Sequence, residues 1–124
     1  MSKCILVVED QADNRQILRD LLGSAGYQLV EAENGEEALK ALARQRPDLI
    51  LMDIQLPIMD GYEATMEIRK RDEAAGRRRR RIIAMTANAL EGDREKCLAA
   101  GMDDYLSKPT KQNELEIALA RYFV

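Results

Sequence analysis

The sequence contains no histidine among its 124 residues. This absence excludes histidine-based acid–base chemistry, the commonest zinc ligand, and the formation of phosphohistidine within this chain. No apolar run approaches the roughly 18 residues of a membrane-spanning helix, and the short N-terminal segment lacks the long apolar stretch of a secretory signal. We therefore expect a cytoplasmic protein with no membrane insertion.

Cysteine is scarce, and the sequence contains neither a cysteine-based metal motif nor a glycine-rich dinucleotide motif. Cys4 and Cys97 lie far apart and form no C-x-x-C pair, so we expect free thiols rather than a disulfide framework or a zinc site. No G-x-G-x-x-G occurs. The net charge of −3 gives no global attraction to nucleic acid, and no direct DNA binding is expected.

The chain is long enough for one domain and too short for a second folded module, which predicts a single domain over residues 1–124 without an effector domain. Short apolar runs predict buried parallel strands, and the segments between them carry apolar residues at helical spacing. The expected strands cover 4–8, 29–30, 48–53, 82–86 and 105–107, and the helices include 62–72, 89–100 and one with its apolar stripe from Leu115 to Tyr122.

Five strands that alternate with five helices predict an α/β fold. Right-handed crossovers leave few topologies, and we expect a flavodoxin-like, doubly wound (βα)5 three-layer sandwich. Its five-stranded parallel sheet would have the order 2-1-3-4-5. Ligands of such sheets bind beyond the carboxyl ends of the strands, where strands one and three meet.

Carboxylates follow two of the predicted strands at this place. Glu9 and Asp10 come after the first strand and Asp53 ends the third. Close carboxylates repel by up to about 4 kcal/mol per pair at an effective dielectric of about 20, a cost that a hard divalent cation would offset. We expect Mg²⁺, with Mn²⁺ as a plausible substitute, bound directly by Asp10 and Asp53 and through water by Glu9. The alternative is an acidic patch that serves solubility.

Two further strand ends offer groups that complement an anion. Thr86 supplies a hydroxyl and Lys108 an ammonium group. Each taken alone could be structural, but together they outline a phosphate site beside the acids. A carboxylate there could attack phosphorus to form an acyl phosphate.

Four blocks of the sequence, VVEDQADNR, LILMDIQLPIMDGYE, IIAMTANA and DDYLSKP, resemble the receiver domains of two-component response regulators, and the resemblance covers essentially the whole chain. It implies that Asp53 is the phosphoacceptor and that the Gln55 backbone carbonyl is a further Mg²⁺ ligand. Further roles follow by resemblance: Thr86, Ala87 and Lys108 contact the phosphoryl group, Thr86 and Tyr105 switch together, Gln55 and Asn88 tune dephosphorylation, and the Lys108–Pro109 peptide is cis.

The resemblance implies a phosphoacceptor signalling protein rather than an enzyme. Its phosphoryl donors would be a sensor histidine kinase or a histidine phosphotransfer protein. A downstream protein would bind the face of the fourth helix, fifth strand and fifth helix, through which a homodimer could also form. A stand-alone switch and a phosphorelay carrier both stay open, and the MDIQLPIMDGYE and MTANA segments favour relay partners because they are similar to receivers of hybrid kinases.

The segment Arg77–Arg81 departs from the family, whose members commonly place a proline just before the Ile-Ile pair. Its position before the fourth strand puts it at the end of the sheet opposite the acids. We expect a solvated loop, with an acidic partner or a local nucleic-acid contact as the alternatives.

Two other classes also use this fold or this chemistry. A haloacid-dehalogenase-like phosphohydrolase usually has a second acid two residues after its nucleophile, where this chain has Gln55. A flavodoxin needs a phosphate loop rich in hydroxyl groups and glycine after strand one, and Glu9, Asp10 and Asp13 would repel that phosphate.

Overall fold

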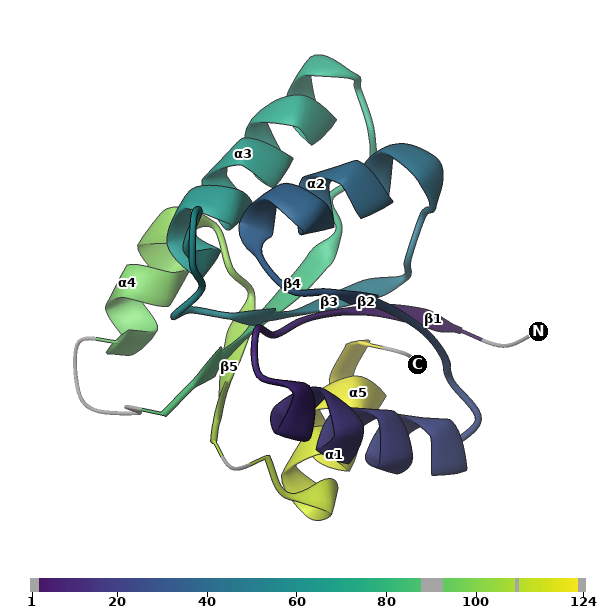
Figure 1. The fold of residues 1–124 in the computed structure, drawn as a ribbon. Helices are drawn as coiled ribbons and strands as arrows, with labels where there is room; N and C mark the ends of the chain where they lie inside the picture. Colours follow the sequence, from purple (N-terminus) through teal and green to yellow (C-terminus); the bar gives the residue numbers. More distant parts are fainter. Residues whose placement is uncertain (1–2, 88–92, 109, 123–124) are drawn as a thin grey trace.

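A computed structural model describes residues 3–87, 93–108 and 110–122. Five parallel strands form one sheet in the order β2-β1-β3-β4-β5, as predicted (Figure 1). The strands are β1 (Cys4–Val8), β2 (Gln28–Ala32), β3 (Leu49–Asp53), β4 (Arg81–Thr86) and β5 (Asp104–Ser107).

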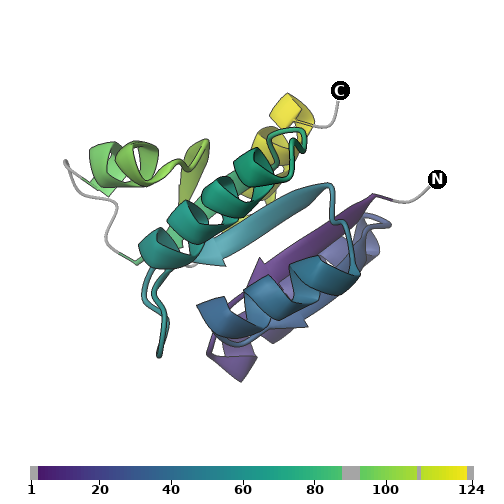
Figure 2. The same ribbon diagram turned by 90° about the horizontal axis from the view of Figure 1, so that it is seen from above.

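Helices cover both faces of this sheet. Figure 1 shows α2 and α3 on one side and α1 and α5 on the other, and the view in Figure 2 places α4 beside α3. The helices are α1 (Ala12–Ser24), α2 (Gly35–Arg44), α3 (Gly61–Ala74), α4 (Asp93–Ala100) and α5 (Gln112–Tyr122). The predicted three-layer, flavodoxin-like sandwich is confirmed.

Alternation along the strands divides the apolar residues between two cores. In β1, Leu6 and Val8 face α2, α3 and α4, whereas Ile5 and Val7 face α1 and α5. The other strands alternate in the same way, because successive side chains of a strand point to opposite faces. Burial on both faces explains why the strands read as continuous apolar runs in the sequence.

Side-chain caps set the start of two helices. The side chain of Asn34 accepts a hydrogen bond from the backbone N–H of Glu37 at 2.8 Å, the usual contact of an asparagine that caps a helix N-terminus. Asp60 caps α3 in the same way through Glu63. Helix α3 is longer than the predicted 62–72, and the part of the predicted fourth helix before Asp93 lies outside the described residues.

The arginine segment before β4 is less solvated than predicted. The Arg80 side chain is only 10% exposed and pairs with Asp72 of α3 at 3.2 Å. Arg79 pairs with Asp103 at 3.1 Å, and Arg81 lies over the ring of Tyr122. The expectation of a solvated loop is therefore wrong for Arg80, whereas the side chains of Arg79 and Arg81 are 53% and 51% exposed although each has a partner.

The expectations about the two cysteines and about membrane-spanning helices can be compared with the residues that the structure describes. Cys4 and Cys97 are both free cysteines, and Cys97 is buried in the core. No helix in the described part of the chain is long and apolar enough to cross a membrane.

Candidate functional site

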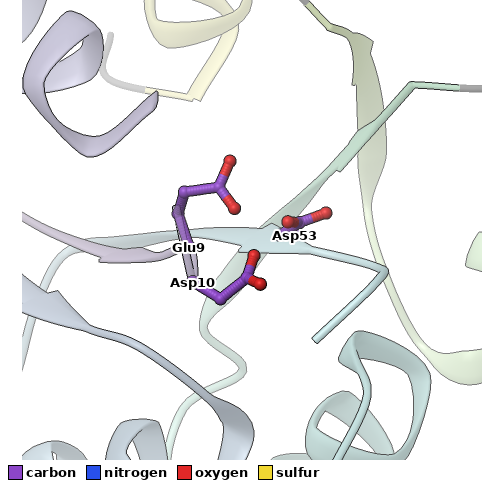
Figure 3. Close-up of side chains that lie close together, drawn as sticks. All are labelled: Glu9, Asp10 and Asp53. Atoms are coloured by element: carbon purple, nitrogen blue, oxygen red, sulfur yellow. The ribbon is translucent and has the colours of Figure 1, made fainter. Parts of the chain in front are cut away.

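The carboxyl ends of β1 and β3 bring three acidic side chains together. Glu9 and Asp10 directly follow β1, and Asp53 is the last residue of β3. These strands are neighbours in the sheet, and Figure 3 shows the three carboxylates gathered in one place. One carboxylate oxygen from each residue lies within 4.8 Å of the other two. The predicted cluster is thus formed by the topology.

Burial differs among the three acids. Glu9 is fully buried and Asp53 is 3% exposed, whereas Asp10 is exposed. A carboxylate loses its hydration on burial and needs a partner of opposite charge or hydrogen-bond donors in its place. Asp10 is therefore hydrated by solvent, whereas the buried carboxylates of Glu9 and Asp53 need cationic or hydrogen-bonding partners within the protein.

Lys108 supplies the positive charge for both buried acids. Its Nζ donates hydrogen bonds to Glu9 Oε1 and to Asp53 Oδ2, each at 2.7 Å. Its backbone N–H donates to the Thr86 carbonyl at 2.8 Å, which extends the pairing of β4 and β5 by one bond and fixes the lysine at the carboxyl edge of the sheet. The predicted placement of this ammonium beside the acids is what the structure has.

The cluster shifts the pKa of several of its groups. Burial raises the pKa of Glu9, and the nearby Asp53 raises it further against the opposing effect of Lys108. Burial and the neighbouring Glu9 raise the pKa of Asp10. Burial lowers the pKa of Lys108, but its hydrogen bonds to Asp53 and Glu9 outweigh burial, so the net shift is upward. The acids repel one another and would gain from a further cation.

The donor set fits Mg²⁺. It consists of carboxylate oxygens with no nitrogen or sulfur, which is the preference of this hard cation. One oxygen, Glu9 Oε2, is buried and has no hydrogen-bond partner among the described residues. A buried carboxylate oxygen without a partner is costly, so a cation or a water bound to one would stabilise it.

The loop after β3 contacts both the side chain and the backbone of Asp53. The backbone N–H of Gln55 donates to Asp53 Oδ1 at 3.2 Å, so the chain passes beside the carboxylate. Gly61 lies so close that a Cβ there would meet the Asp53 carbonyl oxygen at 2.2 Å. The role of the Gln55 carbonyl as a metal ligand stays a prediction.

The remaining predicted residues lie on β4 and β5 or next to them. Thr86 ends β4 and is buried, and Ala87 after it is exposed. Tyr105 is half-buried against the core beneath α2, α3 and α4. Thr86 pairs with Ser107 and Ala84 with Tyr105, so Thr86 and Tyr105 are diagonal neighbours on one face of the sheet. Asn88 and Pro109 lie outside the described residues, and with them the predicted cis peptide.

Comparison with known proteins is decisive. A family model described as the response regulator receiver domain matches residues 5–120. The chain belongs to this family. The receiver domain of the sensor histidine kinase PA1611 from Pseudomonas aeruginosa, which has a magnesium ion coordinated in its active-site cleft, is 48% identical, with a TM-score of 0.87 and 98% of each chain covered.

Other receiver domains and regulators are also similar. The Ssk1 receiver domain of Saccharomyces cerevisiae, crystallised with the histidine phosphotransfer protein Ypd1, has 31% identity and a TM-score of 0.93 over 98% of this chain and 88% of the other. The response regulator DivK of Brucella anthropi is 43% identical over 88% of this chain and 86% of DivK. The sensor histidine kinase RcsC of Escherichia coli K12 is 41% identical over 95% of this chain, which spans only 12% of that kinase.

Reasoning from the sequence missed two residues that shape this receiver site. Arg15 of α1 donates to the Glu9 carbonyl at 2.9 Å and so ties α1 to the end of β1. Gly61 has no Cβ, which allows its backbone to lie directly against the backbone of Asp53. Gly61 lies within the block LILMDIQLPIMDGYE, so the resemblance could have drawn attention to it. Nothing in the local sequence pattern distinguishes Arg15 from other arginines on helix surfaces.

Proposed function

We propose that this receiver domain is a signalling module switched by transfer of a phosphoryl group to Asp53. One observation carries the proposal: the buried Asp53 carboxylate is hydrogen-bonded to Lys108 Nζ and faces two further carboxylates. A nucleophile, a cationic group for the incoming phosphoryl oxygens and an oxygen donor set for Mg²⁺ thus meet at one point.

The transfer follows from these groups. A carboxylate oxygen of Asp53 attacks phosphorus of a phosphohistidine, the new O–P bond forms as the P–N bond breaks, and the released imidazole takes up a proton. Lys108 would leave Glu9 to contact a phosphoryl oxygen, with Thr86 and the Ala87 backbone on the others. Bound Mg²⁺, held by Asp10, Asp53 and the Gln55 carbonyl, would supply the positive charge that offsets the acids. Mn²⁺ offers the same octahedral oxygen chemistry.

The output of the domain would be a changed surface. Thr86 and Tyr105 lie on the same face of the sheet. A shift of Thr86 toward the phosphoryl group would therefore change the space available to the Tyr105 ring. The surface concerned is that of α4, β5 and α5, where a downstream protein or a second copy of the chain would bind. Gln55 and Asn88 would set how long the phosphoryl group survives hydrolysis.

The proposed partners are a sensor histidine kinase and a histidine phosphotransfer protein in the cytoplasm. In support, RcsC is a sensor kinase that contains a similar segment, and the Ssk1 domain was crystallised with a phosphotransfer protein. We propose one receiver domain over residues 1–124 that acts through protein contacts rather than DNA and modifies only itself. A relay carrier and an output switch are both compatible with the site.

Intact-protein mass spectrometry after incubation with acetyl phosphate and Mg²⁺ tests the proposal. We expect the mass of one phosphoryl group to be added to wild type, and no adduct with EDTA or with Asp53→Asn. The matched control is Asp20→Asn, an exposed aspartate on α1, which should react like wild type. The absence of any adduct in wild type would instead favour a scaffold that binds partners without phosphorylation.

A second experiment separates relay from output. The phosphorylated domain is mixed with a histidine phosphotransfer protein, and the label on each protein is followed with time. Rapid loss from this chain with gain by the partner supports a relay carrier, whereas retention supports an output switch.

A further inference from the structure

A surface hollow lies between α2 and α3, far from the acid cluster. It has a volume of about 190 Å³ and sits near the end of the sheet where β4 begins. Its apolar lining comes from both helices, and its polar lining comes from the end of α3 and the segment before β4. The lining residues are Leu39, Leu42, Ala43, Ile68, Arg71, Asp72, Ala75, Arg77 and Arg80.

A buried ion pair forms part of its wall. The side chains of Arg80 and Asp72 are 10% and 7% exposed, and Nε lies 3.2 Å from Oδ2. Yet Arg80 Nη1 and Asp72 Oδ2 have no hydrogen-bond partner among the described residues, although both atoms are buried. A buried guanidinium N–H without an acceptor is costly, and an acceptor in the hollow that reached Nη1 after a side-chain shift would relieve that cost.

The charge around the hollow is positive. Arg71, Arg77 and Arg80 line it, and Asp72 is its one negatively charged lining residue. Burial lowers the pKa of Arg80 the most, Asp72 raises it, and the positive charges of Arg77 and Arg46 lower it further. Glu67 pairs with Arg71 in an exposed bridge at 3.0 Å, a kind of pair that water and salt weaken. The rim therefore favours an anion.

We propose that this hollow binds a small aromatic anion, with its ring against Leu39, Leu42 and Ile68 and its charged group on the arginines of the rim. The volume of about 190 Å³ has room for a single ring, since an enclosed apolar cavity of about 150 Å³ holds benzene. The apolar floor disfavours an inorganic anion, which would leave it uncovered. An acidic protein surface would engage the exposed Arg78 as well, which lies outside the hollow, so the Arg78→Gln variant separates that partner from a small ligand. The oxygen atoms of the ligand would contact Arg71 and Arg77, which line the hollow, and would contact Arg80 Nη1 only after a side-chain shift, because that atom is buried.

NMR titration of the Asp53→Asn protein in EDTA tests this binding separately from phosphorylation. Phenyl phosphate and benzoate are the probes, and inorganic phosphate and phenol are the single-feature controls. We expect saturable amide shifts at Leu42, Ala43 and Ala75 with at least one probe, and at least tenfold weaker binding of both controls. The probe that binds more tightly identifies the anionic group as phosphate or carboxylate.

Two arginines of the same segment give a matched pair of variants. Arg77→Gln should weaken the preferred probe at least fivefold, whereas Arg78→Gln, an exposed neighbour outside the hollow, should leave it within twofold. Ala43→Phe, at an exposed position on the lining, should fill the hollow and abolish the shifts while the remaining spectrum stays folded. Equal losses for Arg77→Gln and Arg78→Gln, equal binding of inorganic phosphate, or no saturable shift in folded protein would each overturn the proposal.

Discussion

Gly61 shows how closely the loop after β3 packs against Asp53. An added Cβ would lie 2.2 Å from the carbonyl oxygen of Asp53 and 2.8 Å from Cα of Ile54, both backbone atoms that cannot turn away. The Gly61 N–H also donates to the Ile54 carbonyl at 2.9 Å, which ties the start of α3 to the end of β3. A side chain at this position would move the strand end that carries Asp53.

We expect Gly61→Ala to lower the free energy of unfolding by about 1–3 kcal/mol, the usual range for overpacking. The control is Gly23→Ala in α1, where a Cβ would meet nothing within 4 Å and the gain should be about 0.5–1 kcal/mol. Urea denaturation of both variants measures the difference. Equal effects of the two substitutions would show that the contact with Asp53 is not tight.

Lys108 occupies the position of a cation among the acids. Lys108→Ala should destabilise the metal-free protein by about 2–3 kcal/mol, because two buried carboxylates lose their partner. This loss is slightly smaller than the loss expected for breaking a fully buried ion pair, since the Lys108 side chain is 19% exposed. It should also tighten Mg²⁺ binding by at least tenfold, because like charges about 4 Å apart repel by about 4 kcal/mol at an effective dielectric of about 20, whereas tenfold corresponds to only about 1.4 kcal/mol. Isothermal titration calorimetry with Mg²⁺ checks this, and the exposed Lys111→Ala is the control. Weaker Mg²⁺ binding by Lys108→Ala would contradict the expectation.

At the scale of elements, the sequence was most informative where burial is complete. Runs such as Leu49–Asp53 predicted strands because both faces of the sheet are covered, and the acids at their ends predicted the site. The burial of Arg80 and the ion pair of Arg79 were not predicted because their partners, Asp72 and Asp103, are not neighbours in sequence. Long-range ion pairs leave no periodic pattern, so only the fold reveals them.

Asp103 joins three elements at the base of the sheet. Its side chain is 10% exposed and accepts hydrogen bonds from the Ile82 N–H, Arg69 and Arg79. We expect Asp103→Ala to lower the free energy of unfolding by about 2–4 kcal/mol, since the partly buried Arg69 loses its carboxylate partner and the Ile82 N–H loses its acceptor. Asp20→Ala on the surface of α1 should change it by less than about 0.5 kcal/mol. Thermal and urea unfolding compare the two, and similar losses would contradict the assignment.

For the molecule as a whole, the acid cluster links stability to pH and to Mg²⁺. Folding raises the pKa of Glu9 and Asp10, so it favours their protonated forms. Their contribution to stability is thus fully present below the unfolded pKa values of about 4 and is lost as the pH rises through the raised folded values.

We expect Mg²⁺ to reverse this loss at neutral pH, with a gain of about 2.7 kcal/mol at a concentration one hundred times its dissociation constant. Urea titrations over a pH series, in EDTA and in Mg²⁺, measure both effects. Asp10→Asn should flatten the pH dependence in EDTA and lose the Mg²⁺ increment. An equal increment in wild type and Asp10→Asn would place the ion elsewhere.

The separation of acids and arginines along the strands also gives the molecule an electric dipole. The carboxylates lie at the carboxyl ends of β1 and β3, and the arginine segment lies at the other end of the sheet, before β4. The electric field of a charged partner orients such a dipole before the two proteins make contact. A partner with a basic face around its phosphohistidine would therefore meet Asp53 first, and the arginine end would point away from the encounter and stay accessible to a different ligand.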